Sequence, residues 1–126
     1  MRRYLFLIVF IIFSVTGWAK GKDGYVVATS EAVRADAAWM KVVDALVKKH
    51  KADVIFYKEN IGELQKPLRQ LRPRFVAFVE KPEFLNREYV MEGHRMSRRV
   101  DEDIYADYLW GIITGFSAED LSLIHI

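Results

Sequence analysis

The side chains that most often carry covalent chemistry are scarce in this sequence. It contains no cysteine, which excludes thiol catalysis by these residues and any disulfide framework. None of its serines lies in the Gly-x-Ser-x-Gly pattern of a serine nucleophile. The three histidines lack a metal-ligand spacing such as His-Glu-x-x-His, and the glycines do not form a phosphate-binding loop. We therefore predict no catalytic residue in this chain.

Carboxylates are the remaining side chains that could bind a metal ion or take part in a reaction. Asp101, Glu102 and Asp103 are adjacent, and Asp107 follows within an aromatic run. Calcium prefers carboxylate oxygens, so Asp101, Asp103 and Asp107 are candidates for a calcium site; no other metal or cofactor is predicted. The alternatives are a solvated turn for the adjacent acids and a capping or bracing role for Asp107, which needs hydrogen bonds if it is buried.

The elements that must position these groups are short strands and amphipathic helices. Apolar runs rich in β-branched residues predict buried strands at Tyr25–Thr29, Asp53–Tyr57 and Phe75–Val79. A helix capped by Asp36 separates the first two, and a helix opening on the capping-box pattern Asn60–Glu63 separates the next two. Strands joined by helices of crossover length predict an α/β fold with a parallel sheet in three α/β/α layers.

Three segments leave alternatives open. Pro67 interrupts the second helix, which is either kinked there or begins at Lys66. A further helix is expected from Asn86 to about Arg99. The apolar residues 104–115 could be helix or strand by periodicity, and we expect a helix or an irregular segment packed on the sheet edge.

The N-terminal residues have the pattern of a secretory signal peptide. Arg2 and Arg3 precede an apolar run that is too short for a membrane-spanning helix, and Gly17 and Ala19 suit the −3 and −1 positions of a cleavage site. We expect an exported protein (periplasmic, cell-surface or extracellular), with an uncleaved anchor as the alternative.

The expected organisation of the chain has four parts. A signal peptide at residues 1–19 and a linker at residues 20–24 precede an α/β domain at residues 25–120. Residues 121–126 resemble the translated read-through of a sequencing adapter, and we interpret them as an artefactual tail of a fragment.

Charge argues against a polyanionic partner. Without Arg2 and Arg3 the chain has 17 basic and 17 acidic residues. A near-neutral mature chain gives no electrostatic basis for binding nucleic acid. We also expect no stable membrane span once the signal peptide is removed.

The order of the segments resembles the N-terminal part of gingipain-type cysteine peptidase domains. The similarity runs from Tyr25–Ser30, through the helix bearing Trp39 and the strand Phe75–Val79, to the motif Asp107-Tyr108-Leu109-Trp110-Gly111. Thr114 departs from the family, which tends to have an acid there. The resemblance implies an incomplete caspase-like fold with strand order 2-1-3, and a catalytic histidine and cysteine that would lie downstream of Gly115.

That strand order would create a crevice between the first and third strands. Ligands of open parallel sheets bind beyond the carboxyl ends of the strands, where the order reverses. The candidate crevice residues are Thr29, Ser30 and Glu31 on one side, and Glu80, Lys81 and Pro82 on the other. The alternative is that these are ordinary loop residues.

The expected function is therefore that of the non-catalytic half of an exported gingipain-like peptidase domain. Its partner would be a protein or peptide substrate, bound through the full-length domain. The alternatives are a secreted α/β binding module without enzymatic activity, and a peptidase homologue that has lost its catalytic pair.

Cleavage after Ala19 would give a mature protein that begins near Lys20, because the small residues at positions 17 and 19 suit a signal peptidase. N-terminal sequencing of the secreted protein checks this. Secreted material that still begins at Met1 would contradict it.

Overall fold

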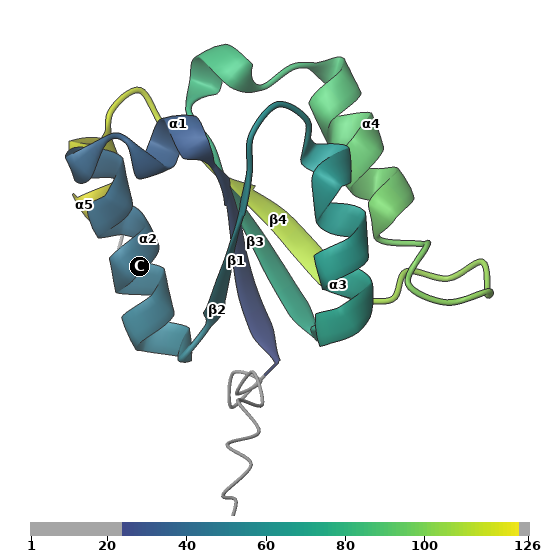
Figure 1. Ribbon diagram of the computed structural model, residues 1–126. Helices are drawn as coiled ribbons and strands as arrows, with labels where there is room; N and C mark the ends of the chain where they lie inside the picture. The colour runs from purple at the N-terminus through teal and green to yellow at the C-terminus, as the bar shows by residue number, and fades with distance from the viewer. Residues whose placement is uncertain (1–23, 124–126) are drawn as a thin grey trace, which may run out of the picture.

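The molecule is built around a four-stranded parallel sheet (Figure 1). The computed structural model describes residues 24–123, so the expected signal peptide, residues 20–23 of the linker and residues 124–126 lie outside the described part. The strands are β1 (Tyr25–Ser30), β2 (Asp53–Tyr57), β3 (Phe75–Val79) and β4 (Leu109–Ile113), in the order β2-β1-β3-β4.

The expected α/β fold and the order 2-1-3 of the first three strands are confirmed. The expectation for residues 104–115 was wrong in part, because Leu109–Ile113 forms a fourth strand beside β3. Two features favour the strand: Ile112 and Ile113 are β-branched, and Gly111 is a poor residue for a helix interior. The neighbouring strand β3 then supplies hydrogen bonds that an isolated segment would lack.

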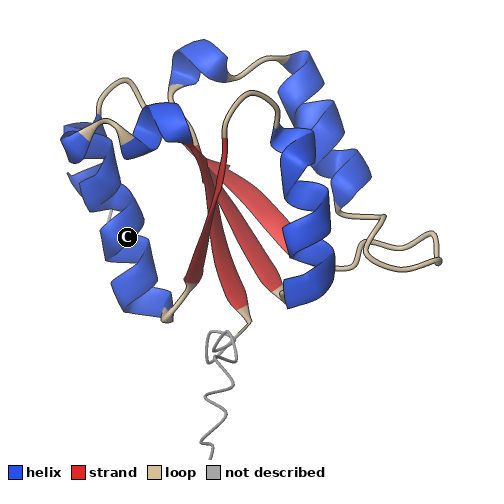
Figure 2. Cartoon of the chain, viewed as in Figure 1, coloured by secondary structure: helices blue, strands red, loops and turns tan. Residues whose placement is uncertain are grey.

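Helices cover both faces of the sheet and complete the three layers (Figure 2). One face carries α1 (Glu31–Arg34), α2 (Ala37–His50) and α5 (Ala118–Leu123). The other carries the 3₁₀ helix η1 (Ile61–Leu64), α3 (Gln65–Leu71) and α4 (Arg87–Met96), and a second 3₁₀ turn, η2 (Pro82–Phe84), leads from β3 into α4.

The strand period of two divides the buried side chains between two cores. Val26 and Phe78 point to the core beneath α3 and α4, whereas Val27 and Val79 point to the core beneath α2 and α5. Trp39 is buried on α2 in the second core. Burial on both faces explains why β1 and β3 read as continuous apolar runs rather than as alternating ones.

The helix boundaries resolve the segments left open by the sequence. The turn η1 precedes α3, which begins at Gln65, so Pro67 falls in the first helical turn, where its missing N–H breaks no intrahelical bond. Helix α4 ends at Met96, three residues before the expected end. Leu121, placed in the expected tail, is buried against the second core.

In the part of the chain from residue 24 to residue 123, no helix has both the length and the apolar character needed to cross a membrane.

The turn η1 is held by the predicted capping box. The Asn60 side chain accepts a hydrogen bond from the N–H of Gly62, and the Glu63 carboxylate accepts bonds from the N–H groups of Lys58, Glu59 and Asn60 at 3.0–3.1 Å. These backbone donors hold the pKa of Glu63 below its ordinary value.

Replacing Glu63 by glutamine should lower stability at neutral pH, because the three donors lose their charged acceptor. A lowered folded-state pKa contributes stability above the unfolded pKa, about 4.3, and loses it as pH falls through the folded value. The difference in urea unfolding between wild type and Glu63→Gln should therefore be larger at pH 7 than at pH 3. An unchanged difference at both pH values would contradict this account.

Candidate functional site

A buried carboxylate lies where β1 and β3 end. Glu80 directly follows β3 and is 0% exposed. Thr29 pairs with Val79 across the sheet, so the next residues, Ser30 and Glu80, are neighbours. The Ser30 hydroxyl donates to Glu80 Oε1 at 3.0 Å, and the N–H of Lys81 donates to the same oxygen at 2.9 Å. The crevice predicted between the first and third strands is thus bridged by side chains.

Two tyrosines complete this cluster. Tyr57 pairs with Ser30 in the sheet register and lies at the carboxyl end of β2. Its hydroxyl donates to Glu80 Oε2 and lies 3.3 Å from the hydroxyl of Tyr89 on α4. Ser30, Tyr57 and Glu80 share the sheet face that α4 covers, so Tyr89 approaches Tyr57 from the same side of the sheet as Glu80 does.

The tyrosines keep their protons over the physiological range. Burial raises the pKa of Tyr89 to about 12. Burial and the hydrogen bond to Glu80 also raise the pKa of Tyr57. Both groups can therefore only donate or accept hydrogen bonds at neutral pH and cannot contribute negative charge.

The cluster forms the floor of a cleft of about 870 Å³. Its walls come from the loop after β2, from the turn η2 and from the first turns of α4, which meet at the carboxyl end of the sheet. Charged side chains gather at its exposed rim: the acids Glu59, Glu83, Glu88 and Glu92, and the bases Lys58, Arg87 and Arg95. A cleft of this size accommodates a small molecule.

The predicted crevice residues divide into two groups. Ser30 and Glu80 line the cleft. Thr29 is buried, and its hydroxyl donates to the carbonyl of Val79 at 2.7 Å. Glu31 pairs with Arg34 and Lys81 pairs with Asp36, so both side chains are engaged in ion pairs. Pro82 opens the exposed turn η2.

Sequence reasoning missed Tyr57 and Tyr89 as site residues. The signal that could have found Tyr57 is positional, because it ends the second strand on the same face as Ser30. Tyr89 belongs to the inner stripe of α4, where an aromatic residue is first expected to be core. Only the packing of α4 against the strand ends brings the two hydroxyls together.

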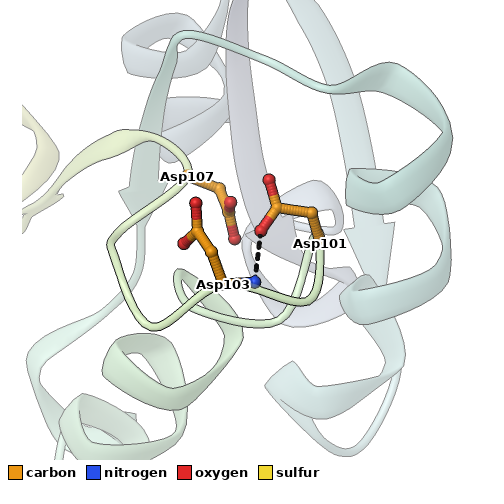
Figure 3. A group of neighbouring side chains, drawn as sticks. All are labelled: Asp101, Asp103 and Asp107. Atoms are coloured by element: carbon orange, nitrogen blue, oxygen red, sulfur yellow. Dashed lines mark hydrogen bonds between the residues drawn. The ribbon is translucent and has the colours of Figure 1, made fainter.

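A second candidate site lies at the opposite end of the sheet, in the loop before β4 (Figure 3). The carboxylates of Asp101, Asp103 and Asp107 approach one another, each with an oxygen within 4.8 Å of the others. Hard oxygen ligands fit calcium, which takes six to eight of them, so these three would need further oxygens from backbone or water.

The same carboxylates also hold the loop together. Asp101 accepts from the N–H of Asp103, and Asp103 accepts from the N–H of Tyr105. Asp107 accepts from the N–H of Val100 at 2.9 Å, and its own N–H donates to the carbonyl of Ser97 at 2.7 Å. Asp107 therefore fastens the start of β4 to the end of α4.

Replacing Tyr57 by phenylalanine should destabilise the protein by about 2 kcal/mol, because a buried carboxylate loses one of its three donors. Tyr25→Phe, at the amino end of β1, is the matched control and should change stability by less than about 0.5 kcal/mol. Chemical unfolding at pH 7 measures both. Equal stabilities of the two variants would show that the Tyr57 bond to Glu80 contributes nothing.

No protein-family model, curated protein sequence or solved structure matches this chain.

Proposed function

We propose that this chain is the N-terminal, non-catalytic part of an exported gingipain-like cysteine peptidase domain. The observation that carries the proposal is the spatial order of the segments that resemble the gingipain-type domains. The strand order 2-1-3 that the resemblance implies is the order in the sheet, and the Asp107–Gly111 motif leads into β4 beside β3.

The edge of the sheet supports the same proposal. In the described residues β4 pairs only with β3, and its sequence Leu-Trp-Gly-Ile-Ile carries neither charge nor proline. Leu109 is 67% exposed. Proteins usually protect a solvent-exposed edge strand with charges, prolines or bulges, so an unprotected apolar edge favours a further polypeptide segment beside β4.

On this proposal the chain has a scaffolding role. The catalytic histidine and cysteine of the complete domain lie beyond Gly115, and no residue described above takes their place. The chain alone is therefore inactive as a cysteine peptidase, in agreement with the lack of any cysteine in its sequence. Export places the complete domain where it meets protein or peptide substrates.

The second candidate function is a secreted α/β binding module without enzymatic activity. The specific observation that favours it is the cleft above Glu80, which has the volume of a small-molecule site and a polar floor. This function needs no residues beyond those described.

Extending the open reading frame past residue 120 tests the first proposal. We expect a histidine after one downstream strand and a cysteine after the next. The extended protein should hydrolyse peptides and lose that activity on thiol alkylation, whereas the 126-residue chain should show none.

A complete gene without a downstream cysteine and histidine would overturn the peptidase proposal. If the downstream strands are present but the two catalytic residues are replaced, the protein is a homologue that has lost its catalytic pair. If no further α/β segments follow, the binding module is the function that remains.

A further inference from the structure

We propose that the cleft above Glu80 binds a small organic amine, whose ammonium group is held by the Tyr89 hydroxyl oxygen and the rim carboxylates. This inference goes beyond the peptidase proposal and does not depend on it. It rests on the direction of the hydrogen bonds in the cluster, the charge of the rim and the apolar groups beside it.

The direction of the hydrogen bonds follows from the number of protons. The buried Glu80 carboxylate accepts from the Ser30 hydroxyl, the Lys81 N–H and the Tyr57 hydroxyl. Tyr57 has one proton, which is committed to Glu80. Tyr57 therefore has no proton left for Tyr89, and a hydrogen bond across the 3.3 Å between the two hydroxyls is one that Tyr89 donates to the Tyr57 oxygen.

The consequence is that the cleft presents an acceptor. Tyr89 lines the cleft and keeps 8% of its surface exposed. With its proton directed inward, the lone pairs of its oxygen remain for a ligand. The matching group on the ligand is a hydrogen-bond donor, and an ammonium offers three.

The charge of the lining favours a cationic donor over a neutral one. Including Glu80, five carboxylates and three basic side chains line the cleft. Arg95 is paired with Glu92 at 3.2 Å, so this pair takes up one charge of each sign and the excess of carboxylates over basic groups remains. A cleft lined by an excess of one sign raises the local concentration of ligands of the opposite sign.

Two apolar side chains at the cleft suit the rest of an amine. Phe84 is 48% exposed and Met91 is 41% exposed, and both line the cleft. A methylene chain can bury these surfaces, and the ring face of Phe84 attracts a nearby cation. The structure thus favours an alkyl amine or diamine over a metal ion, because a metal ion would not contact the apolar side chains of Phe84 and Met91.

Three probes of similar length but different charge test whether the cleft selects a cation. They are 1,4-diaminobutane, the neutral 1,4-butanediol and the anionic butyrate, each titrated into the purified chain and followed by amide chemical shifts and calorimetry. The diamine should bind more tightly than the diol, shift residues of the cleft and lose affinity with added salt. Butyrate should not bind.

The variants test the named groups. Tyr89→Phe keeps the ring but removes the acceptor and should weaken diamine binding about tenfold, whereas Tyr25→Phe should leave it unchanged. Glu80→Gln should also weaken it, because an amide that donates to Tyr57 turns the Tyr89 proton towards the cleft. If either buried variant fails to fold, the exposed double variant Glu83→Gln and Glu88→Gln provides the comparison, with Glu102→Gln outside the cleft as its control.

The proposal is overturned if the diamine does not bind at millimolar concentration, or if the diol or butyrate binds as tightly. It is also overturned if the shifts map outside the cleft, or if the folded cleft variants bind the diamine as well as their controls do.

Discussion

The arrangement of this fold depends on the burial of one carboxylate. Glu80 is fully buried at the end of β3, and an ionised carboxylate without donors there would cost several kcal/mol. Its donors come from the end of β1, the end of β2 and the backbone at Lys81. A shift of one residue in either strand pair would turn a donor to the other face of the sheet. The cluster therefore selects the observed register.

Much of the framework could be predicted because its signals are local. Runs of β-branched residues identified β1, β2 and β3, and the caps Asp36 and Asn60 identified the starts of two segments. Strand β4 could not be assigned in this way. Its sequence is apolar throughout and has no alternation. Gly111 and the two β-branched isoleucines disfavour a helix only weakly, and the hydrogen-bonding edge of β3 fixes the strand.

The candidate site was predictable to the extent that it depends on chain topology. The adjacency of Ser30 and Glu80 follows from the strand order, which the family resemblance implied. The roles of Thr29 and Lys81 did not follow, because neighbouring residues at a strand end point to opposite faces and meet different partners. Tyr89 required knowledge of how α4 lies on the sheet. Which of the residues near the strand ends line the cleft is decided by tertiary packing, and local sequence patterns do not show it.

Helix α4 connects the two candidate sites, and its position determines the shape of the cleft. Its first turn carries Tyr89, and Ser97, the residue that follows its last turn, is bound to the acidic loop by a hydrogen bond from the Asp107 N–H to its carbonyl. Between them Gly93 lies against the Trp110 ring so closely that an added Cβ would come within 3.3 Å of it. The helix thus packs against β4 through Gly93, and the loop is hydrogen-bonded to the residue that follows its C-terminal end. One continuous helix therefore runs from the acidic loop at one end of the sheet to the cleft at the other.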